Sequence, residues 1–217
     1  SSTGNMLVDK MNSLLNIFNG TDMLIAAHCE DQETIKNNIE KYKQKYKGAD
    51  DIPVSAHPSI RSVPACYASS ELAVRLAKIA GARLHILHVS TAKELQLFSD
   101  EPLASKNITA EACVAHLLFT LTHYNSLGTR IKCNPAVKRK TDREALRAAV
   151  NSGLIDVIAT DHAPHLLNEK EGGALKAMSG MPMIQFSLVS MLELVDEGVF
   201  SLETVVQKMC HAPARIY

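Results

Sequence analysis

The sequence contains no tryptophan, and aromatic residues make up only 5% of the chain. Proteins that bind single-stranded nucleic acid stack bases on aromatic rings, so this scarcity argues against such a platform. Neither sign of charge is in excess, because 23 lysines and arginines balance 23 aspartates and glutamates. A chain without net charge has no overall field that attracts phosphate or an anionic lipid surface. We therefore expect no nucleic-acid partner and no membrane partner.

Cysteines are few, odd in number and scattered, and they never occur in C-x-x-C spacing. A disulfide framework or a thiolate zinc site is therefore not expected. No apolar run is long enough to cross a bilayer, and no signal peptide is recognisable. These absences are typical of a cytoplasmic protein with reduced thiols. The five cysteines are Cys29, Cys66, Cys113, Cys133 and Cys210.

The chain does have enough apolar residues for one large domain, 46% of 217 residues. Short apolar runs alternate with amphipathic stretches, which predicts an α/β fold with a parallel sheet and helical crossovers. Strands are expected at 23–27, 83–89, 108–114 and 157–160, and a short extended piece at 130–134. Helices are expected at 6–18, 32–47, 64–80, 91–98, 116–123, 141–152, 183–197 and 201–211. No predicted strand is followed by G-x-G-x-x-G, which argues against a dinucleotide-binding module.

About four strands with helices are too few for a closed eight-stranded barrel. The chain is therefore expected to form either half of such a barrel or a smaller doubly wound sheet. Residues 1–5 read as a small polar loop without an initiator methionine, and an opening within a loop favours the half barrel. The loop at 166–182 is long, polar and glycine-containing, and loops of this length are usually functional.

The stretch 156–165 reads D-V-I-A-T-D-H-A-P-H and begins as a strand. Alternation along the strand predicts that Val157, Ala159 and Asp161 share one face. Asp161 would then lie at the C-terminal end of the strand, the edge at which barrels of parallel strands carry their chemistry. A carboxylate there, with imidazoles nearby, suits metal binding and proton transfer. The alternative reading, an aspartate that only caps the next helix, is about equally common.

Two histidines occupy similar positions at the ends of other predicted strands. His28 ends the first strand, and His88 lies near the end of R-L-H-I-L-H-V at 83–89. Alternation predicts that His85 faces the other way, so His88 is the better candidate for the rim. Each of these residues alone is more often structural than functional. His28, His88 and Asp161 at equivalent strand ends together favour a metal site. The remaining histidines, at 57, 116, 123, 162 and 211, are interpreted as structural.

Four motifs together resemble those of the amidohydrolase superfamily, and more narrowly those of the dihydroorotases, its cyclic amidohydrolases of pyrimidine biosynthesis. They are H-C-E-D at 28–31, L-H-I-L-H-V-S-T at 84–91, C-N-P-A-V-K at 133–138 and A-T-D-H-A-P-H at 159–165. The resemblance spans the whole chain, and the motifs follow the family's order. It implies a (β/α)8 TIM barrel that holds two zinc ions.

The resemblance also implies roles for individual residues. His28 and His88 would bind one zinc ion, and Asp161 would bind the other and act as the proton shuttle. The residues implied for substrate binding are Asn134, His165 and the backbone around Ser179 and Gly180. The implied reaction is the zinc-dependent, reversible hydrolysis of the cyclic amide of dihydroorotate to N-carbamoyl-L-aspartate. Its partner would be this small-molecule substrate, with a homodimer left open.

The departures from the family pattern concern segments that the sequence does not contain. The paired His-x-His of the first barrel strand, the substrate-binding arginine after it and the bridging ligand, a carbamylated lysine in many members, are absent. We therefore expect 1–217 to be a partial catalytic barrel domain, lacking the N-terminal strands and a small C-terminal β domain, and inactive by itself.

Two other functions stay open at this point. A related cyclic amidohydrolase, such as a dihydropyrimidinase, hydantoinase or allantoinase, acts on rings without the carboxylate of dihydroorotate. Such an enzyme would not need Asn134 and His165. An inactive dihydroorotase-like scaffold would lack the upstream metal ligands in its full reading frame.

Overall fold

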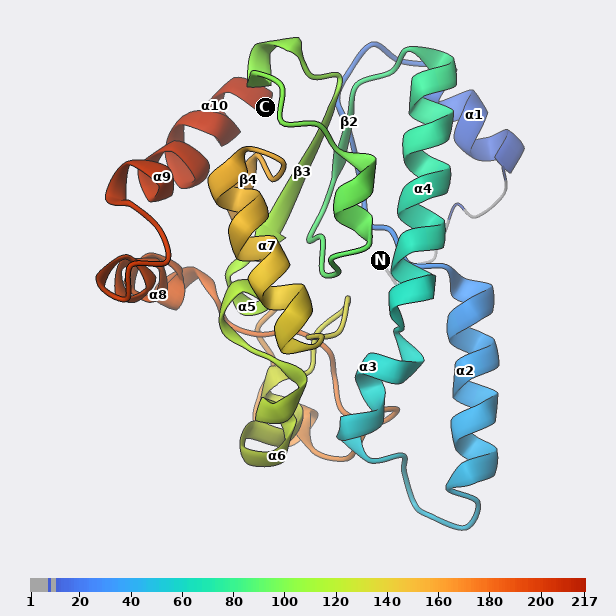
Figure 1. Ribbon diagram of the computed structural model, residues 1–217. Coiled ribbons are helices and arrows are strands. Elements are labelled where there is room, and N and C mark those ends of the chain that lie inside the picture. Colours follow the sequence, from blue (N-terminus) through green and yellow to red (C-terminus); the bar gives the residue numbers. More distant parts are fainter. Residues whose placement is uncertain (1–7, 9–10) are drawn as a thin grey trace.

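The computed structural model describes residues 8 and 11–217, so the predicted loop at 1–5 lies outside the described part of the chain. Its centre is a sheet of four parallel strands (Figure 1). The strands β1 (Ile25–Ala27), β2 (Leu84–Ile86), β3 (Ile108–Cys113) and β4 (Val157–Ala159) lie side by side in sequence order. A doubly wound sheet reverses its strand order at a switch point, and this order has no reversal. The topology therefore favours the half barrel.

Helices connect and follow the strands, and local signals in the sequence account for several of their ends. They are α1 (Met11–Asn19), α2 (Gln32–Lys45), α3 (His57–Ile60), α4 (Val63–Ala80), α5 (Val114–Leu118), α6 (Tyr124–Leu127), α7 (Lys140–Ser152), α8 (Ile184–Asp196), α9 (Leu202–Val206) and α10 (Ala212–Ile216). Helix α2 begins after Asp31, whose carboxylate accepts a hydrogen bond from Thr34 N at 2.8 Å. Helix α4 ends at Gly81, which has the left-handed conformation (φ 65°) that glycine adopts without strain.

The two faces of the sheet differ in chemistry. Leu84 and Ala110 belong to one buried apolar cluster together with residues of α4 and α7, the helices that flank the strands in Figure 1. His85 is fully buried, and its ring nitrogens lie 2.7 Å from Thr109 Oγ1 and 3.2 Å from Glu111 Oε2. These contacts compensate for the loss of hydration that burial of an imidazole entails. One face thus packs against helices, whereas the other carries polar side chains.

Some local predictions were wrong. The helix expected at 91–98 is a single 3₁₀ turn, Glu94–Leu97. The buried Glu94 carboxylate accepts hydrogen bonds from Thr91 N at 3.1 Å and Ser90 N at 3.3 Å, so the Glu94 side chain folds back onto the preceding loop. The extended piece expected at 130–134 is not a strand, because Gly128–Ile131 forms a 3₁₀ turn. The helix expected at 116–123 is divided into α5 and a 3₁₀ turn at 121–123.

No helix among the described residues has the length and apolar character needed to cross a membrane. All five cysteines are free, and all but Cys210 are buried.

Candidate functional site

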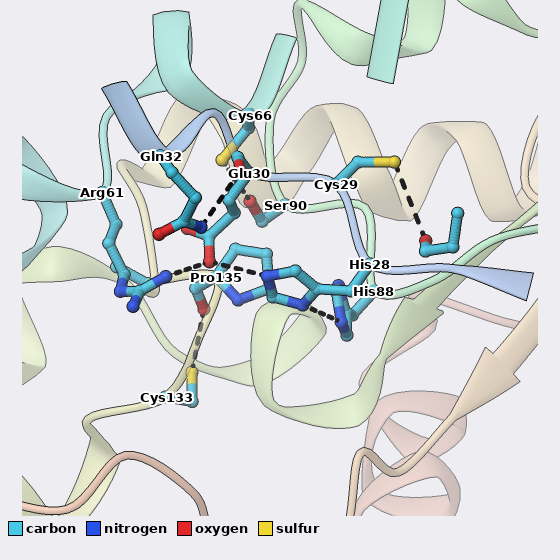
Figure 2. A network of polar contacts seen from close by, with 12 residues as sticks. His28, Cys29, Glu30, Gln32, Arg61, Cys66, His88, Ser90, Cys133 and Pro135 are labelled. Atoms are coloured by element: carbon cyan, nitrogen blue, oxygen red, sulfur yellow. Dashed lines mark hydrogen bonds and ion pairs between the residues drawn. The ribbon is translucent and has the colours of Figure 1, made fainter. Parts of the chain in front are cut away.

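Two histidines from neighbouring strands meet beyond the C-terminal end of the sheet. His28 directly follows β1, His88 lies two residues after β2, and these strands pair with each other. His28 Nδ1 and His88 Nε2 lie 2.9 Å apart, and the ring planes are inclined at 75° (Figure 2). Imidazole nitrogens from two elements that converge on one point are typical ligands of zinc.

A buried carboxylate contacts the other ring nitrogen of His28. Glu30 Oε2 lies 3.1 Å from His28 Nε2 and accepts a hydrogen bond from Arg61 Nη1 (Figure 2). Burial alone would raise the pKa of Glu30, but hydrogen bonding with His28 and the charge of Arg61 lower this pKa to about 2. Glu30 is therefore ionised at neutral pH and favours a proton on Nε2 of His28. The lone pair of His28 Nδ1 then faces His88, as in histidines that bind a metal.

His88 is positioned by its backbone conformation. Strand β2 ends at Ile86, so strand alternation does not extend to His88, which has a left-handed φ of 38°. Glu111 Oε1 on β3 accepts a hydrogen bond from His88 N at 3.3 Å. Burial, together with the charges of His28 and His116, lowers the pKa of His88 to about 3. Its ring is therefore neutral at neutral pH, which is the form that binds metal ions.

The two histidines fit a zinc ion as part of its ligand set. The donor set is suitable, because two imidazole nitrogens from neighbouring strands face each other at 2.9 Å. Among the described residues, however, no group of three or more histidine, cysteine, aspartate or glutamate side chains is arranged to hold a metal ion. The structure thus pairs His28 with His88 and does not add Asp161 to them as a third member of one compact cluster.

Asp161 lies just beyond the end of β4, with a left-handed φ of 45°. The residue as a whole is exposed. Partial burial of its carboxyl group, and then the negative charge of Glu111, raise the pKa of Asp161 above its ordinary value. A carboxylate with a raised pKa accepts a proton more readily at neutral pH, as a proton shuttle must.

All seven residues predicted for the site line one cavity of about 580 Å³. They are His28, His88, Asn134, Asp161, His165, Ser179 and Gly180. Apart from histidines, the charged residues of the lining are Arg61, Lys132 and Lys176 on the positive side and Asp161 on the negative side. Arg61 is compensated by the buried Glu30 and Lys176 by Asp50, so the positive charge of Lys132 remains to favour a ligand that carries an anionic group.

Two histidines interpreted as structural hold the segment that contains Asn134. His57 Nε2 lies 2.9 Å from Cys133 O, and His116 Nε2 lies 3.0 Å from Pro135 O. Since a carbonyl accepts, both rings donate through Nε2. Burial lowers the pKa of His57 to about 3 and that of His116 to about 4, so both rings are neutral at neutral pH. The backbone on both sides of Asn134 is thereby fixed.

The loop predicted at 166–182 closes the cavity on another side. His165 Nε2 donates to Ser179 O at 3.1 Å, which ties the start of the loop to its end. Gly180 has a φ of 143° and passes close to Ala163. A Cβ atom on Gly180 would lie 2.5 Å from Ala163 O and 2.6 Å from Ala163 Cβ. Both distances are shorter than normal contacts, so only glycine fits here.

We expect Gly180→Ala to displace the loop from the cavity, because the methyl group clashes with backbone and the φ is strained. Strain of this kind costs about 1–3 kcal/mol. Gly48→Ala is the matched control, since Gly48 also has a positive φ of 88° but nothing lies within 4 Å of its Cβ position. Urea unfolding and the KM of the full-length protein are the measurements. Equal effects of the two variants on both quantities would show that the close approach at Gly180 is unimportant.

The sequence-based interpretation missed three residues that shape the site. Glu30 was visible within H-C-E-D, and Glu111 was visible as an acidic residue inside the apolar run 108–114. No sequence pattern indicated Arg61, because its partner Glu30 lies 31 positions away in the chain.

Comparison with known proteins gives a consistent result. A profile of the amidohydrolase family matches residues 8–217. A dihydroorotase of Endomicrobium trichonymphae is 34% identical over 196 residues, 89% of this chain and 44% of that protein. A dihydroorotase of Geobacter sulfurreducens is 31% identical over 208 residues, 95% of this chain and 47% of that protein. The chain thus spans about half the length of these relatives.

Solved structures of hydantoinases share the fold. An L-hydantoinase (dihydropyrimidinase) from Arthrobacter aurescens superimposes with a TM-score of 0.89 and 27% identity, over 99% of this chain and 48% of that one. A D-hydantoinase (dihydropyrimidinase) from a Thermus species gives a TM-score of 0.85 at 18% identity, over 97% of this chain and 47% of that one. These likenesses confirm the predicted fold class, an α/β fold that is part of a TIM barrel.

Proposed function

The chain belongs to the amidohydrolase family, and we propose that the protein carrying it is a zinc-dependent cyclic amidohydrolase that hydrolyses dihydroorotate reversibly to N-carbamoyl-L-aspartate. The observation that carries this proposal is the convergence of His28, His88 and Asp161 on one cavity. The relatives named dihydroorotase, 34% and 31% identical, support the choice of substrate.

We infer that His28 Nδ1 and His88 Nε2 hold one zinc ion of a binuclear centre and that Asp161 holds the second. When bound, zinc polarises the amide carbonyl and lowers the pKa of water towards ~7. Glu30 and Arg61 keep the His28 ring in the orientation seen in Figure 2. His88 keeps its place through its backbone hydrogen bond to Glu111.

Asp161 moves the proton in this proposal. As water attacks the ring carbonyl, a C–O bond forms, and the Asp161 carboxylate takes the proton that the water loses. The C–N bond of the ring then breaks, and Asp161 returns the proton to the departing nitrogen. Ring closure of N-carbamoyl-L-aspartate runs through the same steps in reverse.

Binding of the substrate carboxylate distinguishes dihydroorotate from neutral rings. We infer that Asn134 and His165 contact the carboxylate and the ring, together with the backbone of Ser179 and Gly180. Lys132 adds positive charge to the lining, which favours an anionic substrate over a neutral one.

The alternative with specific support is a hydantoinase or dihydropyrimidinase. It rests on the TM-score of 0.89 with the L-hydantoinase. Hydantoin and dihydropyrimidine rings lack the carboxylate of dihydroorotate. For them, the positive charge of the lining would have no counterpart in the substrate.

The test is an assay of the full-length protein with dihydroorotate, hydantoin and dihydrouracil. We expect kcat/KM for dihydroorotate to exceed that for hydantoin by about a hundredfold or more, because an unpaired polar site rejects a ligand that lacks the matching group. Removal of metal by a chelator should abolish activity, and added zinc should restore it. Preference for hydantoin would favour the alternative. Lack of activity with zinc bound would favour an inactive scaffold, and activity that survives chelation would contradict the metal site.

A further inference from the structure

A buried lysine beside the cavity is surrounded by backbone carbonyl groups. Lys170 is 6% exposed. Its ammonium donates to Met178 O at 2.8 Å, Gly180 O at 2.8 Å and Lys132 O at 3.1 Å. An ammonium group has three hydrogens, and here each has its own acceptor. The burial of this charge is therefore compensated by the ends of three peptide dipoles.

Two of these carbonyls belong to the residues on either side of Ser179, which lines the cavity. Another buried lysine, Lys132, acts on the same segment, because its Nζ donates to Ala177 O. Gly180 N in turn donates to Lys132 O at 2.8 Å. Residues 177–180 are thus held by two lysine side chains, together with the hydrogen bonds from Met178 N to Glu169 O at 2.9 Å and from His165 Nε2 to Ser179 O at 3.1 Å.

The outer part of the loop has a different anchor. The Asp51 carboxylate accepts hydrogen bonds from Gly173 N at 2.6 Å, Lys176 N at 3.0 Å and Leu175 N at 3.2 Å. Ala174 is buried in an apolar cluster that also contains Ile52. The outer part can therefore stay in place when the contacts of Lys170 change, and only the part next to the cavity depends on this lysine.

We propose that Lys170 is a positioning residue, whose ammonium fixes the carbonyls of Met178 and Gly180 and thereby holds the backbone of Ser179 at the substrate. The role at the substrate rests on the proposed function, whereas the fixing of the loop does not. A neutral amine has only two hydrogens and leaves one of the three carbonyls unpaired. Methionine has a similar length and no hydrogens to donate.

The surroundings of Lys170 make this arrangement sensitive to alkaline pH. Burial lowers the pKa of Lys170 to about 8, with Cys133 acting in the opposite direction. Burial, and then the charges of Lys170 and Arg61, lower the pKa of Lys132 to about 8, against the effect of Asp51. Both lysines therefore begin to lose their third hydrogen within the range of ordinary assays.

Loop order and overall stability should respond to this pH change in opposite directions. The folded-state pKa of about 8 lies below the ordinary lysine value of 10.5. Between these values the unfolded chain binds more protons than the folded chain, so this lysine makes the protein more stable as pH rises. The loop, in contrast, loses a hydrogen bond over the same range. A lysine without a role in holding the loop would not make loop protection fall while overall stability rises.

Hydrogen exchange of the loop amides in the full-length protein tests the proposal. In Lys170→Met we expect the protection of amides 177–180 to fall by about tenfold or more, the equivalent of one charge-assisted hydrogen bond. The KM for dihydroorotate should rise by a similar factor, with a much smaller change in kcat. Lys208→Met is the matched control, because Lys208 is also partly buried and donates to a carbonyl, Ile155 O at 2.6 Å, that lies outside the loop at 166–182.

The wild-type protein provides a test that needs no variant. After correction for intrinsic exchange, protection of amides 177–180 should fall between about pH 7 and pH 9, while amides 173–176 keep theirs. Unchanged protection in both Lys170→Met and the wild-type pH series would overturn the proposal. If Lys170→Met does not fold, the pH series of Lys132→Met decides, because Lys170 is then the lysine that still titrates beside residues 177–180. If the wild-type protein does not hydrolyse dihydroorotate, the proposed function fails, and exchange still decides whether Lys170 holds the loop.

Discussion

Asp161→Asn is expected to lower kcat for ring opening by about a thousandfold, since general acid–base catalysis contributes about 10²–10⁴-fold. The asparagine amide has the shape of the carboxylate but does not take a proton from water or return it to the ring nitrogen. The backbone should tolerate the change, because asparagine adopts the left-handed conformation of this position (φ 45°) readily. The measurement is steady-state turnover of dihydroorotate by the zinc-loaded, full-length protein.

Two controls separate the proton shuttle from other roles of Asp161. Asp100→Asn changes an exposed carboxylate that does not line the cavity, so it should leave turnover and stability as they are. Zinc content is measured on the same samples. If Asp161→Asn loses zinc in proportion to turnover, the loss of turnover is assigned to the role of Asp161 as a metal ligand. Retained turnover would refute the shuttle role altogether.

The sequence was sufficient to place the strands and their functional ends. All four strands lie within the predicted ranges, because each belongs to a short stretch rich in apolar residues. Parallel strands bring their C-terminal ends to one edge of a sheet, so His28, His88 and Asp161 could be assigned to a common rim. All three line one cavity in the structure.

Details of the site that depend on contacts between distant segments could not be predicted. Lys170 reaches carbonyl groups of a loop and of residue 132, 38 positions away, and nothing in the local sequence indicates this. The left-handed backbone at His88 and Asp161 was equally hidden, because neither residue type signals a positive φ as glycine does. Strand alternation was the basis for choosing His88 and Asp161, although the strands end before both residues.

Arg61→Met is expected to lower the free energy of unfolding by about 3 kcal/mol, the usual effect of breaking a buried ion pair from one side. The Glu30 side chain is fully buried (0% exposed), and that of Arg61 is 12% exposed. Methionine retains the apolar volume of the arginine stem but removes the charge, so Glu30 is left with His28 alone. Arg75→Met is the control, because Arg75 and Glu71 form an exposed pair, 52% and 40% accessible, worth at most about 0.5 kcal/mol. Urea unfolding of metal-free protein gives both values.

The pH dependence of this loss in unfolding free energy distinguishes the contribution of the Arg61 charge from that of packing. The pKa of Glu30 falls from 4.5 to about 2 on folding, so its ionisation stabilises the protein above about pH 4.5, and this stabilisation disappears as pH falls through about 2. Since Arg61 contributes to the lowered pKa, the difference between wild type and Arg61→Met should be largest at neutral pH and should shrink across this window. A difference that stays constant with pH would mean that Arg61 stabilises the protein by packing. In that case the orientation of His28 would depend on Glu30 without any contribution from the arginine charge.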